Sequence, residues 1–308
     1  MTLPKDAQWS SGISIFLRRY CPGNFGHLLL DAILPAFVSF YTFYPEYEGQ
    51  DPGIIVDDLC SGASLFEYNQ ENCENVSARL LPFLSDNVHF VRSSANTLCF
   101  EEMVSSNCKY GLYSSLGGIG AIPNHAFKKF RGYVWRRALK FNTVNNYDIN
   151  TTLPTVLVTF KNPGQRRRSV NMPEVSGWLQ ETFNGQARVI LKNQAEMPLS
   201  QSITLLSGLF LFVTPAGGTA MSTVFLPSKA SVIVGTFCDK CDVNTCGNWE
   251  VGVFFQHLEK LDVHYDVYPV RQEDMVHPRE EQGCNYRMGD KDWLISKSKE
   301  AYVRMYTD

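Results

Sequence analysis

The sequence has no excess of positive charge. Its 28 lysines and arginines stand against 31 aspartates and glutamates, which gives a formal net charge of -3 at pH 7. A protein that binds nucleic acid normally carries a strong basic excess, so the composition argues against a nucleic-acid partner. A bound anion would have to meet basic side chains that gather locally.

The first twenty residues lack the basic start, the apolar core and the small-residue cleavage site of a secretory leader. The apolar run at 25–44 has the length of a membrane span, but it carries His27, Asp31 and Pro35, and ionisable groups are costly in hydrocarbon. We therefore expect a buried helix and no transmembrane segment. The expected location is cytoplasmic as the sequence stands, or the ER or Golgi lumen if a leader has been removed.

The nine cysteines form no familiar metal-binding pattern. Cys238, Cys241 and Cys246 are the only cluster, and a zinc site would need His257 or Cys284 as a fourth ligand at a spacing that matches no common zinc ribbon or finger. Buried thiols, or one disulfide in an oxidising compartment, are the alternatives. We expect no metal and no cofactor.

From about residue 150 onward, short β-branched or aromatic runs alternate with helix-like stretches. The runs lie at 155–160, 187–192, 209–214, 231–236 and 264–270, and the helix candidates between them at 173–183, 199–206, 219–226 and 251–261. Continuous apolar strands alternating with helices indicate a parallel sheet covered on both faces. Residues 151–308 are therefore predicted to form a doubly wound α/β domain.

Residues 1–150 are less regular and predict a second α/β domain. A helix is expected at 24–41, strands at 53–58 and 87–91, and a basic, aromatic helix near 125–141. The asparagine-rich segment 142–154, closed by a proline, suits a linker, and two domains of this size leave room for a cleft between them. The last stretch, 290–306, is expected to form an amphipathic helix that packs back across the first domain.

A pair of adjacent glycines, Gly217 and Gly218, lies between the apolar runs 209–214 and 231–236. The pair is open to three readings: a hairpin turn, a break in a membrane span, or a phosphate-binding loop between a strand and a helix that starts at Thr219. We interpret the segment as a strand that ends at Val213, a glycine turn and a helix. Glycines let backbone N–H groups approach a phosphate that also meets a helix dipole, although a tight turn alone would need them as well.

Three consecutive arginines, Arg166, Arg167 and Arg168, follow the first strand of the same domain. Loops after successive parallel strands lie on one edge of the sheet, so the arginines are expected near Gly217 and Gly218. Guanidinium groups suit bidentate phosphate recognition, and a solvated basic loop is the alternative. Together the two features predict a diphosphate site.

A polar stripe crosses the apolar helix near the N-terminus. His27 and Asp31 are one helical turn apart, and Asn24 extends the stripe. The stripe is either a solvated edge or the side of a helix that faces a cleft, where His27 or Asp31 would take a proton from a hydroxyl.

Four stretches in this order, "NFGHLLLDAILP", "RRRSVNMPE", "PLSQSITLLSG" and "TPAGGTAMSTVFLPSKASVIVG", resemble the ordered motifs of glycosyltransferase family 61. That family includes plant β-1,2-xylosyltransferases and O-linked N-acetylglucosaminyltransferases. The resemblance covers about 160–236 and 24–35. Many relatives have a His-Gly-Ala-Gly-Leu type segment where this chain has Ala-Gly-Gly-Thr-Ala at 216–220, so no histidine role transfers there.

The resemblance implies two Rossmann-like domains facing a cleft (GT-B), a UDP-sugar donor, a glycan or glycoprotein acceptor and inversion at the anomeric carbon. UDP-xylose is the first expectation and UDP-N-acetylglucosamine the second. His27 and Asp31 are the candidate catalytic residues. The candidate donor-binding residues are Arg166, Arg167, Arg168, Gly217, Gly218 and Thr219, with Asn24, Asn171 and Glu174 as further candidates.

Two other classes of protein stay open. A nicotinamide-dependent oxidoreductase would share the fold, but no G-x-G-x-x-G follows the first strand of either half. A non-catalytic carbohydrate-binding or scaffold protein would retain the fold without the reaction. Asp290-Lys-Asp292 has the pattern of a metal-binding Asp-x-Asp, at the start of the expected last helix.

Overall fold

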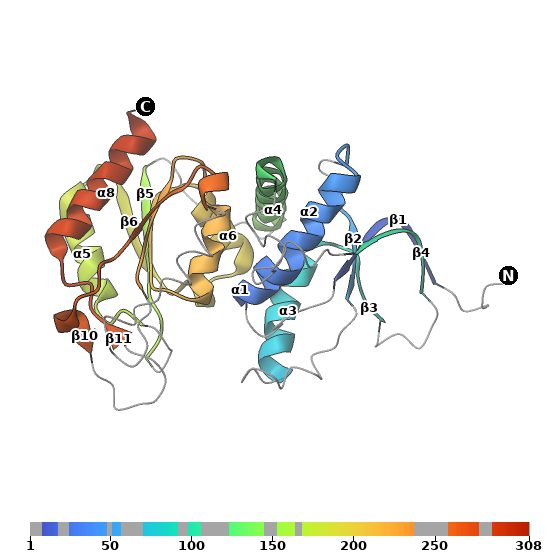
Figure 1. Cartoon of the computed structure of the whole chain (residues 1–308), viewed down its shortest axis with the longest axis horizontal. Coiled ribbons are helices and arrows are strands. Elements are labelled where there is room, and N and C mark those ends of the chain that lie inside the picture. The colour runs from blue at the N-terminus through green and yellow to red at the C-terminus, as the bar shows by residue number, and fades with distance from the viewer. Residues whose placement is uncertain are drawn as a thin grey trace. The chain divides into compact units, whose positions relative to one another are not determined.

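The computed structural model describes residues 8–17, 25–47, 51–56, 70–91, 98–105, 123–144, 153–163, 168–236, 258–276 and 285–307. The chain divides into two compact units, Met1–Phe141 and Asn142–Asp308, each with its own parallel sheet (Figure 1). The division falls in the last turn of helix α4 (Asn124–Val144), a few residues before the boundary expected near 150. The predicted α/β class is confirmed.

The first unit contains a four-stranded parallel sheet in the order β3-β2-β1-β4. Its strands are β1 (Gln8–Leu17), β2 (Gly53–Val56), β3 (Val88–Phe90) and β4 (Leu98–Ser105). The sequence pattern indicated β2 and β3 and missed the other two. Gly12, at φ 77°, interrupts β1 where its register with β4 shifts, and β4 carries exposed Glu101 and Glu102 at its centre. Neither strand therefore reads as a continuous apolar run.

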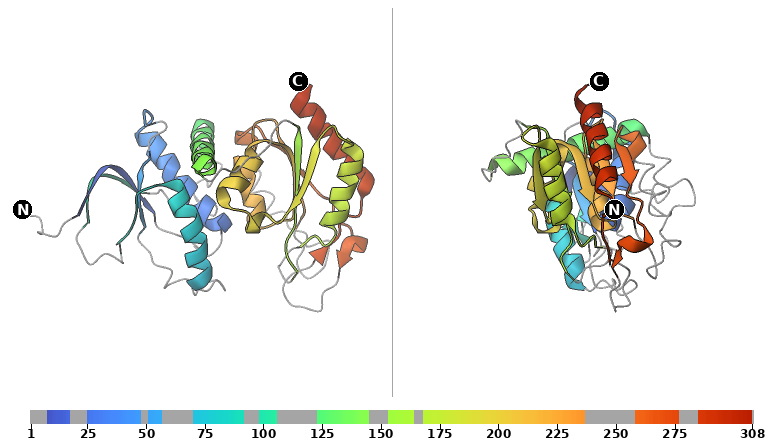
Figure 2. Two further views of the ribbon diagram at one scale, coloured as in Figure 1. Left: turned by 180° about the vertical axis from the view of Figure 1, so that it is seen from behind. Right: turned by 90° about the vertical axis from the view of Figure 1, so that its left-hand side faces the viewer.

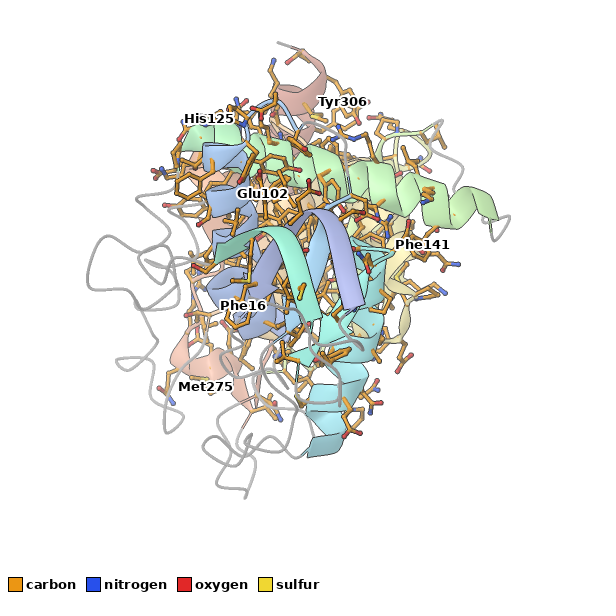
Figure 3. All side chains as sticks on the ribbon, turned by 90° about the vertical axis from the view of Figure 1, so that its right-hand side faces the viewer. Phe16, Glu102, His125, Phe141, Met275 and Tyr306 are labelled. Carbon is orange, nitrogen blue, oxygen red and sulfur yellow. The ribbon has the colours of Figure 1, made fainter. Side chains whose placement is uncertain are left out.

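Polar contacts hold this irregular strand pair in place. The Gly12 N–H donates to the Glu101 carboxylate at 2.8 Å, and the Tyr44 hydroxyl donates to Glu102 at 2.6 Å. Figure 3 labels Glu102 on β4 and Phe16 on β1. These acidic side chains therefore have structural roles in the first sheet.

The apolar N-terminal run forms a helix of three consecutive parts: α1 (Phe25–His27), a π-helical segment η1 (Leu28–Ile33) and α2 (Leu34–Phe43). A single α-helix was predicted. Pro35 has no N–H to donate to the carbonyl of Asp31, so regular α-helical bonding cannot continue through this point. All residues from Leu34 to Tyr41 are buried, which makes α2 a core helix. In the part of the chain that the structure describes, none of the helices has the length and apolar character that crossing a bilayer requires.

Helix α4 is tied to the end of helix α3 (Gln70–Leu84) through Arg137. The buried guanidinium donates to the carbonyl of Phe83 at 2.8 Å and to the carboxylate of Asp86 at 2.9 Å. The last carbonyls of a helix have no partner within it, so Arg137 stabilises an end that would otherwise be unsatisfied. Arg137, together with Lys140, holds the pKa of the Asp86 carboxyl well below its usual range.

The second unit contains a five-stranded parallel sheet in the order β6-β5-β7-β8-β9. All five predicted strands form. They are β5 (Thr155–Thr159), β6 (Arg188–Lys192), β7 (Leu209–Thr214), β8 (Ser231–Val234) and β9 (His264–Val267). Every residue of β5, β7 and β8 is buried, as expected for central strands covered on both faces.

Helices cover both faces of this sheet, which confirms the doubly wound prediction. Figure 2 shows α5 (Met172–Phe183) beside α8 (Lys291–Tyr306), and Figure 1 shows α6 (Leu199–Ser207) on the opposite side of the strands. The predicted helix at 219–226 is a 3-10 helix, η7 (Gly218–Phe225). Of the predicted helix at 251–261, residues 251–257 lie outside the described part and 258–260 are helical.

The short elements of the second unit lie at two places in the chain. A 3-10 turn, η6 (Gln194–Glu196), follows β6. A second 3-10 turn, η10 (Gln272–Asp274), precedes the antiparallel pair β10 (Met275–Val276) and β11 (Asn285–Tyr286). The strand β11 of this second group contacts the loop that leads into α5.

The described contacts of α8 lie within its own unit. Leu294, Ser298 and Ala301 are buried, and the Tyr302 ring lies 5.8 Å from Phe183 of α5 and 5.4 Å from Phe210 of β7. Helix α8 therefore packs on α5 and β7, and its expected packing across the first domain stays a prediction. The aromatic side chains of α8 pack against aromatic rings of α5 and β7.

Candidate functional site

The strand order of the second unit defines where a ligand is expected. Numbered within the unit, the order is 2-1-3-4-5, and the direction of connection reverses between β5 and β7. In open parallel sheets, ligands bind outside the carboxyl ends of the strands at this switch point. The relevant loops are those that follow Thr159 of β5 and Thr214 of β7.

The loop after β7 contains a backbone conformation that only glycine adopts readily. Gly217 has φ 106° and ψ -158° and caps the N-terminus of η7. A side chain at this position would be strained, and its Cβ would lie 3.0 Å from the Nζ of Lys161. The predicted helix start at Thr219 is wrong: Thr219 is the second residue of η7, and the cap is a glycine without a side chain.

Lys161 brings a positive charge from the loop after β5 onto this glycine turn. Its ammonium donates to the carbonyl oxygen of Ala216 at 2.6 Å. The arginines of the same loop were predicted to bind the donor, whereas Lys161 was not. A basic residue two positions after the last residue of β5 was the available signal, since strand ends at the switch point face the ligand.

The arginines of the loop are only partly described. Arg166 and Arg167 lie outside the described residues. Arg168 is half-buried; its backbone N–H donates to the Asn285 side chain at 3.2 Å, and its carbonyl accepts from the N–H of Tyr286 at 3.1 Å. These bonds attach the end of the arginine loop to β11.

Asn171 and Glu174 have partners within the protein. The Asn171 amide exchanges hydrogen bonds with the backbone of Met288, at 2.9 Å and 3.1 Å, and donates to Glu174 at 3.2 Å. Glu174 also pairs with Arg287 at 2.6 Å. Both side chains thereby attach the start of α5 to the two residues that follow β11, and their part in donor binding stays a prediction.

A buried amide that no sequence motif indicated, that of Gln194, supports the helical segment after the glycine turn. Gln194 is 8% exposed, and its Nε2 donates to the hydroxyls of Ser202 at 2.9 Å and Ser222 at 2.8 Å. Its backbone N–H donates to Thr159 Oγ1 at 3.3 Å. Gln194 therefore connects the end of β5, helix α6 and η7, so the loops at the switch point have a common polar support.

The candidate catalytic residues follow the central strand of the first unit. In the order 3-2-1-4 the connection reverses at β1, and the chain leads from β1 to α1 and η1. His27 ends α1 and Asp31 lies in η1, while Asn24 lies outside the described residues. π-helical segments are rare and frequently mark functional sites. The position of His27 and Asp31 in the fold is therefore compatible with the predicted catalytic role.

The described residues contain no group of three His, Cys, Asp or Glu side chains placed to hold a metal ion. Asp290 of the Asp-x-Asp pattern caps α8, where it accepts from the N–H of Trp293 at 3.0 Å and pairs with Arg271 at 2.5 Å. The cysteine cluster at 238–246 lies outside the described part. The expectation of activity without a metal stays a prediction.

The fold and this edge define an α/β protein with two parallel sheets, whose second sheet carries a cation and a glycine turn at its switch point. No protein-family model matches the sequence, and no curated protein matches it. Among solved structures, the chain is similar to the E. coli heptosyltransferase WaaC with ADP-2-deoxy-2-fluoro heptose, at 11% identity over 94% of this chain and 100% of that one, with a TM-score of 0.37. It is similar to the iron-containing dodecameric glycosyltransferase TibC from enterotoxigenic E. coli H10407, at 12% identity over 73% and 58% of the two chains, with a TM-score of 0.33. Likeness at these values assigns no family, so the functional argument rests on the residues of the site.

Proposed function

We propose that the chain is a glycosyltransferase that moves a sugar from a UDP-sugar to a hydroxyl of a glycan or glycoprotein. The observation that carries the proposal is the contact of the Lys161 ammonium with the turn at Gly217, at the switch point of a doubly wound sheet. A cation beside a pair of glycines is suited to a diphosphate, which needs both opposite charge and close approach of backbone N–H groups.

The same groups would assist departure of the nucleoside diphosphate. Negative charge grows on the leaving phosphate as the sugar passes through an oxocarbenium-like state. Lys161 and the arginine loop would stabilise that charge electrostatically, together with the N–H groups around Gly217 to Thr219. The residues that bind the diphosphate of the donor would thus also lower the barrier to sugar transfer.

The acceptor hydroxyl needs a base, and His27 or Asp31 is proposed for this role. Direct attack of the activated hydroxyl would invert the anomeric carbon. UDP-xylose is the proposed donor and UDP-N-acetylglucosamine the alternative, both on the resemblance to glycosyltransferase family 61. The resemblance and the Lys161 contact are independent arguments for a nucleotide-sugar donor.

Calorimetric titration with UDP, UDP-xylose, UDP-N-acetylglucosamine, ADP and NAD tests the proposal and ranks the donors. We expect UDP and one UDP-sugar to bind, and that sugar to be hydrolysed slowly without acceptor. Binding of NAD in place of UDP would favour a nicotinamide-dependent oxidoreductase. Binding of the sugar nucleotide without hydrolysis or transfer to any acceptor would favour a non-catalytic binding protein.

Replacing Lys161 by Met should weaken UDP binding by about tenfold or more, because a charge-assisted hydrogen bond contributes about 1.5–3 kcal/mol. Calorimetry on the purified variant measures the change. Lys299→Met, at an exposed position of α8, is the matched control and should bind UDP as the wild type does. Equal affinity of Lys161→Met and the wild type would remove Lys161 from the site.

Transfer activity should persist in EDTA, since electrostatic stabilisation by Lys161 and the arginine loop does the work that a metal ion does in other transferases. Turnover is measured with the best donor of the panel before and after dialysis against the chelator. Loss of activity that manganese restores would show that a metal takes part.

A further inference from the structure

A carboxylate also lies at the edge of the second sheet where the C-terminal ends of its strands meet. Glu196, at the end of η6, follows β6, the strand next to β5. One oxygen of its exposed carboxylate, Oε1, accepts from Asn162 Nδ2 and from Asn193 Nδ2, both at 2.9 Å. Two amides from two different loops therefore hold this carboxylate in position.

The carboxylate of Glu196 lies near the proposed diphosphate site, because its donor Asn162 is next to Lys161 in the sequence. Asn162, which donates to Glu196, is the residue after Lys161, which donates to the carbonyl of Ala216 beside Gly217. Glycine turn, ammonium, amide and carboxylate thus follow one another along the edge from β7 to β6. Both amides use Oε1, and within the described residues Oε2 makes no hydrogen bond to the protein.

The order of these groups along the sheet edge matches the order of phosphates and ribose in a nucleoside diphosphate. The ammonium and the glycine turn suit the phosphates, whereas a carboxylate would repel them. A carboxylate only accepts hydrogen bonds, and the hydroxyls of a ribose are the donors next to the phosphates of a nucleotide. In dinucleotide-binding sheets, an acidic residue further along the βαβ unit accepts from a ribose hydroxyl.

We propose that Glu196 binds a ribose hydroxyl of the nucleotide and makes the site select ribonucleotides over deoxyribonucleotides. The inference rests on the proposed function and adds the residue that recognises the sugar of the nucleotide. The competing role is structural, because Asn193 also caps η6 by accepting from the N–H of Ala195 at 3.1 Å, and Glu196 would then only orient that cap.

The experiment compares the affinities of wild type and Glu196→Gln for UDP, 2′-deoxy-UDP and 3′-deoxy-UDP, and repeats the series with ADP and its deoxy forms. In Glu196→Gln the amide oxygen keeps the two asparagine donors, and the group near the ribose loses its charge. We expect the wild type to bind the ribonucleotide about tenfold or more tightly than at least one deoxy form, and the ratio to fall to about two or less in the variant. Glu181→Gln, at an exposed position of α5, should keep the wild-type ratio.

The outcomes separate the inference from the proposed function. Equal discrimination by the wild type and Glu196→Gln, or wild-type binding of both deoxy forms as tightly as the ribonucleotide, would overturn the ribose assignment while nucleotide binding stands. A general loss of affinity for all forms with an unchanged ratio would show that Glu196 only shapes the loop. Failure of the wild type to bind either ribonucleotide would overturn the proposed function and this inference with it.

Discussion

Gly217→Ala should lower the affinity for UDP by more than tenfold and lower the free energy of unfolding by about 1–3 kcal/mol. The destabilisation follows from the backbone, because φ 106° with ψ -158° belongs to a region that residues with a Cβ rarely adopt. The affinity loss follows from the new methyl group, which would lie 3.0 Å from the Lys161 ammonium and on the approach of a phosphate to the turn. Calorimetry and denaturant unfolding measure the two effects.

Gly185→Ala is the matched control for strain. Gly185 also has a positive φ, 81°, but a Cβ there meets nothing within 4 Å, and the residue lies in the turn after α5. The control should lose about 1–2 kcal/mol of stability and keep the affinity for UDP. If Gly217→Ala bound UDP as tightly as Gly185→Ala, the turn would be a structural element only.

His27→Ala or Asp31→Asn should lower turnover by about 10²-fold or more and leave the affinity for UDP nearly unchanged. A general base contributes to the transition state of proton transfer, whereas the proposed nucleotide contacts belong to the second unit. Both variants are needed, because Asp31 could orient His27 instead of taking the proton itself. The measurements are steady-state transfer rates and calorimetric UDP affinity on the same preparations.

The pH dependence of turnover separates the two candidates. An imidazole and a carboxylate lose their protons in different pH ranges, so a change of base should move the acid limb of the pH profile. His125→Ala, at an exposed position of α4, is the control for loss of a histidine and should leave the profile unchanged. Wild-type rates in both His27→Ala and Asp31→Asn would place the base elsewhere, with 45–150 the first region to search.

The second unit was predictable because its signals are local. Five apolar runs separated by helix-like stretches predicted five parallel strands, and all five form in a doubly wound sheet. The glycine pair was placed correctly between a buried strand and a helical segment, since turn chemistry depends on neighbours in the chain. The first unit was harder, because Gly12 and the glutamates of β4 interrupt the apolar pattern of two of its strands.

Some features needed tertiary information. Helix α8 packs on the rings of Phe183 and Phe210, which lie far from it in the sequence. No local pattern predicted these partners. Periodicity indicates which face of an element is apolar, but the partner of that face is chosen among all the apolar faces of the fold.

Residue order alone therefore established the class of the fold, the glycine turn and the charge of the loop after β5, all of which depend on residues close together in the chain. Which of the polar groups meet was decided by the strand order, since β5, β6 and β7 are neighbours in the sheet but far apart in sequence. The contact of Lys161 with Ala216 and of Asn162 with Glu196 spans tens of residues, and each depends on the parallel alignment that brings the carboxyl ends of these strands to one edge. Hydrogen bonds act over about 3 Å, so only the folded chain selects their partners.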